Sequence, residues 1–297
     1  MQTQKTQKSK FLMFPDYRGG NPYQELLEKS LKKEGAVIHY PPQKTTPFCL
    51  SIYSIKYKCN VIHLHWIKKF IGKSNNIIIF LIFYIIFFFD IFISKFILRK
   101  KIIWTVHNLL DHEVKFIRLE KIFRVFLGKI SNAIIIHTYQ GKEKIADYYK
   151  INKNKIFVVP HGNYIGYYQN TLEKGQARQK LNLKNKNFIF LFFGLIRKYK
   201  GIENLIDSFE SFKEDTNVKL LIAGKVKDEE LEKFILEKEK GNPNIITELK
   251  FIPDNEIQPY FNAADAVVLP YTNILTSGTA ILSMSLGLPL VAPQIGD

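Results

Sequence analysis

Residues 192–201 read FFGLIRKYKG, and they place an apolar run directly before three cations. The run ends at Gly194, and Arg197, Lys198 and Lys200 follow it. The next stretch, GIENLIDSFESF, has apolar residues at helical spacing, so the cations lie at or just before a helix N-terminus. That end of a helix carries partial positive charge, which makes each added cation unfavourable by about 0.3–1 kcal/mol. The pattern therefore indicates either a solvated charged loop or a site where an anion binds between the cations.

Apolar runs that read as strands alternate with helix-like stretches along all 297 residues. This alternation implies an α/β fold of parallel, doubly wound sheets with right-handed crossovers. A polar stretch at 166–187 separates two such series, and we expect it to link a domain at 1–170 to a domain at 171–297. The expected strands lie at 10–14, 36–40, 61–66, 101–108, 133–138, 155–162, 187–194, 218–224, 246–253, 265–271 and 288–293.

The net charge of +16 indicates an anionic partner such as phosphate or acidic lipid, unless the many lysines simply solvate the surface. No RNA-binding aromatic signature, zinc-finger spacing or recognition-helix pattern is present, so we expect no nucleic-acid partner. Cys49 and Cys59 form neither a disulfide framework nor a CxxC metal motif, which suits a reducing compartment. The polar start lacks the apolar core of a secretory signal, so we expect a cytoplasmic protein.

The most apolar stretch, 77–98, connects the expected strands at 61–66 and 101–108. Asp90 interrupts it after 13 residues, whereas a membrane-spanning helix needs about 20. A span would also place two strands of one sheet on opposite sides of a membrane. Two interpretations stay open: a crossover helix buried against the sheet, or an interfacial helix that also enters lipid. The near absence of a polar face favours the second, with attachment to an anionic membrane surface.

TSGT at 276–279 opens another helix after the expected strand at 265–271. Ser277 and Thr279 offer hydroxyl groups, and Gly278 lets a ligand approach the backbone. Two anion sites in one half of the chain predict a bound diphosphate. The sequence contains no GxGxxG, no GxxxxGK[ST] and no D-x-D, so we expect protein cations rather than a metal ion to neutralise it.

With these motifs in their order, the chain resembles the retaining, metal-independent glycosyltransferases of the two-domain GT-B type, family 4 (group 1). The resemblance implies two Rossmann-like domains facing a cleft, with a nucleotide sugar held mainly by the second, and no cofactor. It implies a hexosyltransferase that acts on a lipid-linked or glycan acceptor in polysaccharide biosynthesis. The matching stretches are FPDYRGGNPYQELL, VIHLHW, IIWTVHNLLDHE, VVPHGN, FFGLIRKYKGIENLI, LLIAG, FIPDNEIQPYFNAADAVVLPY and SGTAILSMSLGLPLVAP.

The resemblance also assigns roles by position. Arg197 and Lys200 would grip the donor diphosphate and stabilise the leaving group. His107 would be a catalytic residue that contacts the donor sugar, although a hydrogen-bonded histidine at a strand end fits the same pattern. The remaining donor-binding candidates are Gly19, Gly20, Gly194, Ser277, Gly278 and Thr279, and the acceptor-side candidates are Asn21, Tyr23, Asn108 and His112.

Two features depart from the family pattern. Leu282, and a position near Ile274, stand where many members carry two glutamates, one of which contacts the ribose. The chain ends at Asp297, where the family continues through further helices, so we expect a truncated second domain. The leading interpretation is a glycosyltransferase on the inner face of the membrane. The alternative is a non-catalytic membrane-surface binding module, or an inactive truncated relic of such an enzyme.

Overall fold

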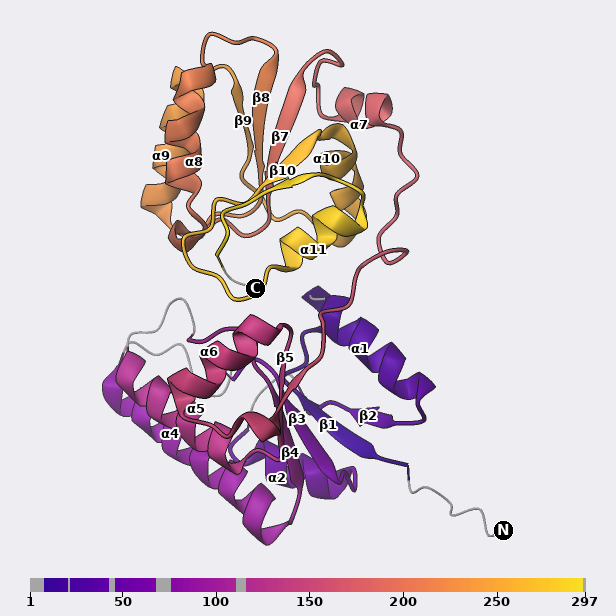
Figure 1. The fold of residues 1–297 in the computed structure, drawn as a ribbon, viewed down its shortest axis with the longest axis vertical. Helices are drawn as coiled ribbons and strands as arrows, with labels where there is room; N and C mark the ends of the chain where they lie inside the picture. The colour runs from indigo at the N-terminus through magenta and orange to yellow at the C-terminus, as the bar shows by residue number, and fades with distance from the viewer. Residues whose placement is uncertain (1–7, 21, 43–45, 68–75, 111–115, 296–297) are drawn as a thin grey trace. The chain divides into compact units, whose positions relative to one another are not determined.

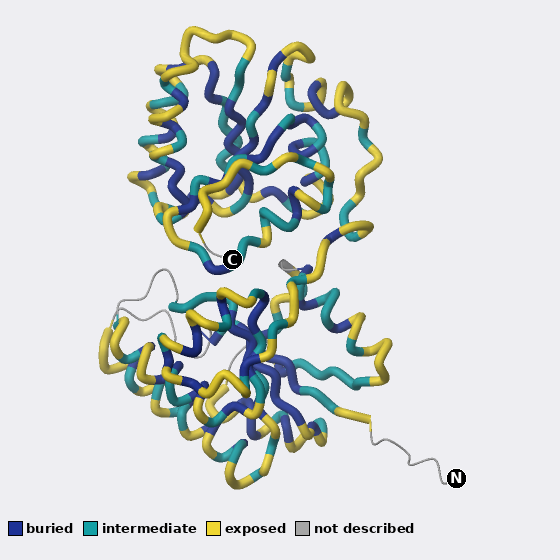
Figure 2. The backbone as a smooth tube through the Cα atoms, viewed as in Figure 1, coloured by how far each residue is buried: buried dark blue, intermediate teal, exposed yellow. Residues whose placement is uncertain are grey.

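The computed structural model describes residues 8–20, 22–42, 46–67, 76–110 and 116–295. The chain divides into two compact units between Gly162 and Asn163 (Figure 1). Each unit is one sheet of parallel strands with helices packed on its faces. Figure 2 shows the buried backbone concentrated in the strands of both sheets, as parallel sheets covered by helices require.

The first unit contains a six-stranded sheet in the order β2-β1-β3-β4-β5-β6. Figure 1 shows α1 on one side of this sheet and α4, α5 and α6 on the other. The strands are β1 (Lys10–Phe14), β2 (Val37–His39), β3 (Val61–Leu64), β4 (Lys101–Thr105), β5 (Ala133–Ile136) and β6 (Ile156–Val158). The helices are η1 (Arg18–Gly20), α1 (Pro22–Lys33), α2 (Cys49–Lys56), α4 (Ile77–Phe92), its π-helical continuation η2 (Ile93–Ile97), α5 (Ile117–Ile130), α6 (Tyr139–Tyr149) and η3 (Lys153–Lys155).

The second unit contains a five-stranded sheet in the order β11-β10-β7-β8-β9. Its strands are β7 (Phe188–Phe193), β8 (Val218–Ala223), β9 (Ile245–Glu248), β10 (Ala266–Val268) and β11 (Leu290–Val291). Its helices are α7 (Lys174–Lys180), η4 (Lys198–Lys200), α8 (Ile202–Phe209), η5 (Glu210–Phe212), α9 (Glu229–Gly241), η6 (Asp254–Glu256), α10 (Ile257–Ala263) and α11 (Gly278–Ser285). The α/β class with two parallel sheets is confirmed, and each strand falls within or beside an expected apolar run.

The polar stretch at 166–187 is not a simple linker, because it forms α7 and packs within the second unit. Arg178 is buried there, and its Nε donates to the carbonyl oxygen of Ala263 at 3.0 Å. Its Nη2 pairs with Oδ2 of Asp265 at 2.7 Å. The polar residues of this stretch therefore serve internal hydrogen bonds and ion pairs, which composition alone does not reveal.

The apolar stretch forms one helix, α4 continued by η2, that links β3 to β4. By length and composition alone, Ile77–Ile97 is able to cross a membrane, with a mean hydropathy of 2.8 and 28% of its most apolar window buried. However, β3 and β4 are paired in parallel register, Val61 with Lys101 and Leu64 with Trp104. The helix is therefore a crossover within one sheet, as the topology argument predicts.

Asp90 does not interrupt this helix, because its carboxylate is buried and binds the N-terminus of α2. The backbone N–H groups of Leu50 and Ser51 each donate to it at 2.8 Å, and the Ser51 hydroxyl donates at 2.6 Å. Burial raises the pKa of Asp90, and these three hydrogen bonds oppose that rise. Phe48, the residue before α2, supplies no side-chain cap, so Asp90 caps the helix from a distant part of the chain.

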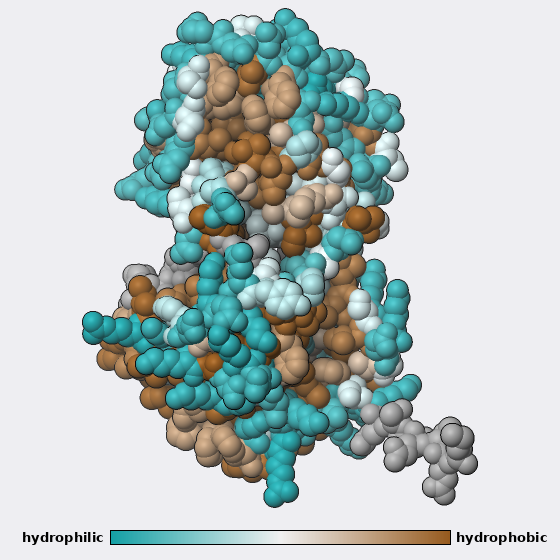
Figure 3. Space-filling model, in the orientation of Figure 1, coloured by the Kyte–Doolittle hydropathy of each residue, from teal (hydrophilic) through white to brown (hydrophobic). Residues whose placement is uncertain are grey.

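One face of α4 and η2 stays exposed although it is apolar. Ile78, the most exposed residue of α4, keeps 64% of its surface accessible. Six of the exposed residues recur at helical spacing along one stripe: Ile78, Ile82, Ile85, Phe89, Phe92 and Phe96. Figure 3 shows apolar surface gathered over the α4 region at the lower left of the view. The opposite face packs on α5, where Phe87 lies 5.0 Å from Phe123 between ring centroids.

Asp90→Ala should lower the free energy of unfolding of the first unit by about 2–4 kcal/mol, because two buried N–H groups lose their acceptor. Both tryptophans, Trp66 and Trp104, belong to this unit, so urea unfolding followed by tryptophan fluorescence reports it alone. Asp147→Ala, at an exposed position on α6, is the matched control and should change stability by less than about 0.5 kcal/mol. Equal urea midpoints for Asp90→Ala and the unchanged protein would show that the remote cap contributes nothing.

Candidate functional site

The loops that follow β7, η4 and β10 meet at the carboxyl-terminal edge of the second sheet. Gly194 follows β7 with a φ of 107°, and its N–H donates to the carbonyl of Ala223 at 3.0 Å. Gly201, with a φ of 70°, ends η4 and starts α8, and a Cβ there would collide with the carbonyl oxygen of Pro270. Thr272 donates twice to the carbonyl of Tyr199, from N at 3.2 Å and from Oγ1 at 3.0 Å. Glycine conformations and backbone hydrogen bonds thus hold these loops together.

Three of the predicted donor-binding residues converge at this edge. A Cβ built on Gly194 would lie 3.5 Å from Nζ of Lys200 and 3.5 Å from Oγ1 of Thr279. Ser277 is the N-cap of α11, and its Oγ accepts from the N–H of Ala280 at 3.1 Å. A cation, a hydroxyl and the N-terminus of a helix therefore surround one point, which is the arrangement that binds a phosphate.

Lys200 is buried, with 8% of its surface exposed, and forms no ion pair with a residue that the structure describes. Burial, and then the charge of Arg197, lower the pKa of Lys200 to about 8. A buried cation without a carboxylate partner is unfavourable, and a bound anion would remove that penalty. Lys198 behaves differently, since its exposed Nζ lies 3.3 Å from Asp228 and 3.7 Å from Glu230. Of the two lysines in the quoted stretch, only Lys200 is placed for an anion.

His107 lies just beyond β4 in the first unit, within a group of aromatic rings. The indole of Trp66 stacks on it with a centroid distance of 4.1 Å and an interplanar angle of 10°. Nδ1 of His65 lies 3.3 Å from Nε2 of His107, and Tyr23 presents its ring perpendicular to His107 at 5.2 Å. Burial, and then the neighbouring histidines, hold the pKa of His107 well below 6.5. The histidine is therefore neutral, and the group offers hydrogen-bonding nitrogens and ring faces.

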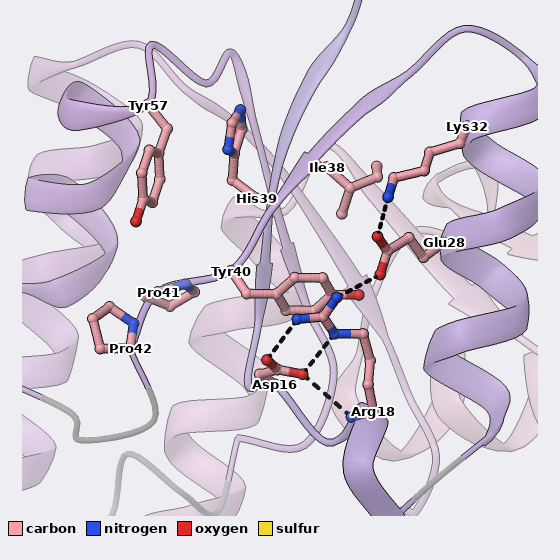
Figure 4. Close-up of a pocket in the computed structure, with 10 residues that line it drawn as sticks. All are labelled: Asp16, Arg18, Glu28, Lys32, Ile38, His39, Tyr40, Pro41, Pro42 and Tyr57. Atoms are coloured by element: carbon pink, nitrogen blue, oxygen red, sulfur yellow. Dashed lines mark hydrogen bonds and ion pairs between the residues drawn. The ribbon is translucent and has the colours of Figure 1, made fainter.

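Arg18 holds the turn η1, which contains Gly19 and Gly20. Its guanidinium donates from Nε and from Nη2 to the two carboxylate oxygens of Asp16, each at 2.9 Å, and from Nη1 to Glu28 at 3.0 Å. It also lies 3.9 Å above the centre of the Tyr40 ring. Figure 4 shows this network beside a cavity of about 600 Å³. A Cβ on Gly19 would meet no atom within 4 Å, so this side of the turn is open to a ligand.

The remaining predicted residues differ in where the structure places them. Asn21 and His112 lie outside the described residues. The carbonyl of Asn108 accepts from Nη1 of the buried Arg124 at 2.9 Å, which fixes its backbone. A Cβ on Gly278 would lie 3.6 Å from the hydroxyl of Tyr164, an ordinary contact distance.

Several residues that the sequence patterns did not single out also belong to these sites. The ring centre of Tyr271 lies 5.7 Å from Nζ of Lys200, and the Tyr271 hydroxyl is 3.2 Å from Oγ of Ser277. Oγ1 of Thr276 is buried without a hydrogen-bond partner in the described part of the chain. His65 and Trp66 belong to the VIHLHW motif, and the spacing of its two histidines is the sequence signal that could have identified them. Within the described ranges, no cluster of three or more His, Cys, Asp or Glu residues is placed to hold a metal ion.

Two open parallel α/β sheets of this kind define the GT-B fold of glycosyltransferases, and solved structures share it. Sucrose-phosphate synthase from Thermosynechococcus elongatus is similar with a TM-score of 0.70 and 16% identity, covering 98% of this chain and 82% of that one. HepE from Anabaena, in complex with UDP-glucose, is similar with a TM-score of 0.69 and 15% identity, covering 98% and 81%. At this level of sequence identity, the similarity shows that these proteins share a fold with this chain.

Similarity to a protein family covers a smaller part of the chain than similarity of fold does. Residues 173–296, which lie within the second unit, match the family model described as "Glycosyl transferases group 1". A curated relative, the GDP-mannose:glycolipid 4-beta-D-mannosyltransferase of Xanthomonas campestris pv. campestris, is 29% identical over 133 residues. That match covers 45% of this chain and 35% of the relative, so the chain spans about a third of the relative's length. Another curated relative, the D-inositol 3-phosphate glycosyltransferase of Pseudarthrobacter chlorophenolicus, is 24% identical over 169 residues, which is 55% of this chain and 40% of the relative.

Binding of a nucleoside diphosphate should weaken as the pH rises above the Lys200 pKa of about 8. Only the protonated lysine attracts the anion, so binding at higher pH requires proton uptake, and affinity should fall by up to about tenfold per pH unit. Calorimetry with UDP and GDP at pH values below and above 8, in buffers of different ionisation enthalpy, measures both affinity and proton uptake. Lys200→Arg keeps its charge throughout and should show a flat profile. If the affinity of the unchanged protein for the nucleoside diphosphate depends on pH as little as that of Lys200→Arg, the assignment is contradicted.

Proposed function

We propose that this protein is a glycosyltransferase that moves a hexosyl group from a nucleotide-sugar donor to a lipid-linked or glycan acceptor. The observation that carries the proposal is the buried Lys200, which lacks a carboxylate partner in the described part of the chain and lies beside Gly194 and Thr279. The similarity of residues 173–296 to group 1 glycosyltransferases supports the same chemistry. The glycolipid acceptor in the name of the Xanthomonas relative supports a lipid-linked substrate.

The donor diphosphate binds at the edge of the second sheet. Lys200 and Arg197 supply positive charge, and the first turn of α11, from Ser277 to Thr279, supplies N–H and hydroxyl donors. When the bond from the sugar to the diphosphate breaks, negative charge accumulates on the leaving group, and these groups stabilise it. Because protein cations neutralise the diphosphate, the reaction proceeds without a metal ion.

The first unit supplies contacts to the donor sugar and to the acceptor. His107 contacts the donor sugar, Gly19 and Gly20 approach the phosphates, and Tyr23 and Asn108 face the acceptor. The neutral histidines suit hydroxyl groups, which both donate and accept hydrogen bonds. The reaction retains the anomeric configuration of the donor, as the resemblance implies. An NMR assignment of the product's anomeric proton tests this point, and inversion would contradict it.

The protein acts in the cytoplasm as a peripheral protein on the inner face of the membrane. The exposed stripe of α4 and η2 supplies apolar side chains that enter the lipid. Exposed basic residues, Arg99 after η2 and Arg118 and Lys121 on the adjacent α5, attract anionic headgroups. A helix in this position lies in the interface rather than across it, because its two ends join neighbouring strands.

Arg197 and His107 should have separable roles. Arg197→Ala should lower turnover by about 100- to 1000-fold, as loss of an electrostatic stabiliser does, and should also weaken diphosphate binding. His107→Ala should leave binding of the bare nucleotide diphosphate nearly unchanged while it lowers transfer, because it meets the sugar. Calorimetry with UDP, GDP and their sugars in EDTA, together with transfer assays, measures both effects.

Two results would contradict this assignment. One is nucleotide binding that disappears in EDTA and returns with Mg²⁺, which would make the donor site metal-dependent. The other is loss of nucleotide binding in His107→Ala with binding preserved in Arg197→Ala, which would reverse the proposed orientation of the donor.

Binding to vesicles should depend on the exposed stripe. The combined change Ile82→Ser, Ile85→Ser and Phe89→Ser should weaken flotation with phosphatidylglycerol-containing vesicles at least about 100-fold, because three large apolar side chains leave the lipid. Circular dichroism should show an unchanged fold, since all three side chains are exposed. Vesicles of phosphatidylcholine alone should bind the unchanged protein more weakly, because they lack negative charge.

The matched control changes exposed apolar residues elsewhere, Ile165→Ser and Phe251→Ser, and should leave flotation unchanged. Phe87→Ser is expected to destabilise the unit instead, because that ring is 2% exposed and packs in the core. Flotation of the triple variant equal to that of the unchanged protein would refute the membrane role of the stripe.

A further inference from the structure

Two side-chain contacts join the carboxyl end of β3 to the carboxyl end of β4. Nε2 of His63 lies 2.8 Å from Oγ1 of Thr105, and Nδ1 of His65 lies 3.3 Å from Nε2 of His107. Residues two apart on a strand share a face, so His63 and His65 extend from one strand end and Thr105 and His107 from its neighbour. His65 follows β3 by one residue and His107 follows β4 by two, so the pairing of these neighbouring strands brings the two rings together.

The surroundings of His65 determine which of its ring nitrogens carries the proton. His65 is 2% exposed, and its Nε2 is buried without a hydrogen-bond partner among the residues that the structure describes. Burial, and then the adjacent histidines, hold its pKa well below 6.5, so the ring is neutral and carries one proton. A buried N–H without an acceptor is rarer in proteins than an acceptor without a donor. The proton therefore belongs on Nδ1, which faces His107.

We propose that His65 is a positioning residue that donates its Nδ1–H to Nε2 of His107 and so holds His107 in the tautomer with its proton on Nδ1. Its catalytic consequence rests on the proposed function of His107. Since Nε2 of His107 accepts this hydrogen bond, the one proton of the neutral ring must lie on Nδ1. No residue in the described part of the chain hydrogen-bonds to that nitrogen.

This tautomer defines what His107 recognises. Nδ1–H is a donor, so the ligand atom opposite it must be an acceptor, such as a hydroxyl or ring oxygen of a sugar. The other tautomer would present a lone pair, which suits a ligand N–H or ammonium group instead. Trp66, stacked on the imidazole at 4.1 Å, limits rotation of the ring and keeps the donor aimed in one direction. His65 thereby favours neutral, oxygen-rich sugars over sugars that present a protonated amine at this position.

The experiment records long-range ¹H–¹⁵N spectra of the full-length chain with ¹⁵N-labelled histidine, which distinguish the two neutral tautomers. The signals of His107 are those lost in His107→Gln. His65→Asn keeps an N–H close to the position of Nδ1, whereas His65→Leu removes the donor at similar volume. We expect the Nδ1–H tautomer of His107 in the unchanged protein and in His65→Asn, and a shift toward the Nε2–H tautomer in His65→Leu.

Transfer assays supply the functional measurement. His65→Leu should lower the turnover number by about 10- to 100-fold, the range found when a partner that orients a metal-bound histidine is removed. Its affinity for bare UDP or GDP should not change, and His65→Asn should recover most of the turnover. A proton on Nε2 of His107 in the unchanged protein overturns the inference whether or not the variants fold, and so does an unaltered tautomer in His65→Leu. The expected tautomers combined with full activity of His107→Ala would support the inference and overturn the proposed function of His107 instead.

Discussion

In both sheets each strand runs parallel to its neighbours, and this constraint determines where the polar residues can meet. Parallel strands need a crossover at each connection, so the strand ends that carry loops and helix N-termini gather at one edge. In the first unit His65, His107 and His137 follow the neighbouring strands β3, β4 and β5. In the second unit the same rule brings Gly194 and Thr279 to one point. The chemistry of each unit is thus a consequence of strand direction.

Asp90 reconciles two requirements of the first unit. The crossover from β3 to β4 is almost entirely apolar, yet α2 begins without a local side-chain cap. One carboxylate inside the apolar helix satisfies the two N–H groups at the start of α2 and fixes the rotation of α4 about its axis. With that rotation fixed, Phe87 faces the core and Ile82 faces outward. A single buried hydrogen-bonding group therefore selects which apolar side chains are exposed.

Much of this architecture is predictable from the sequence because it depends on local patterns. Apolar runs bounded by glycine and proline locate the strands, and the cations before α8 identify Lys200 as an unusual residue. What the sequence does not reveal depends on partners distant in the chain. The start of α2 depends on Asp90, which from the sequence reads as a break in an apolar run. The polar stretch at 166–187 reads as a linker because the ion pair of Arg178 with Asp265 is visible only in three dimensions.

The residues of the candidate sites also divide into those that the sequence predicts and those that it does not. Residue type and position before a helix singled out Lys200 and Thr279, and the family resemblance added Gly194, which the structure places within contact distance of both. The role of His65 depends on the register of β3 against β4 and on the burial of one ring nitrogen, neither of which a sequence pattern encodes. Tyr271 contacts the same lysine from a strand end that reads as an ordinary core segment. The sequence thus predicts contacts between residues that adjoin helix ends, but it does not predict contacts between residues of neighbouring strands.

The apolar crossover also has a consequence for synthesis of the chain. The ribosome completes β3 and the helix at Ile77–Ile97 before it reaches β4, so for that interval the helix has no sheet position to close onto. A nascent helix of this length and hydropathy meets the length and composition requirements for membrane insertion, whereas the pairing of Lys101 with Val61 holds it to the sheet. Insertion and sheet closure therefore compete in time, and the short connection from Leu98 to Lys100 favours closure by letting β4 pair as soon as it emerges.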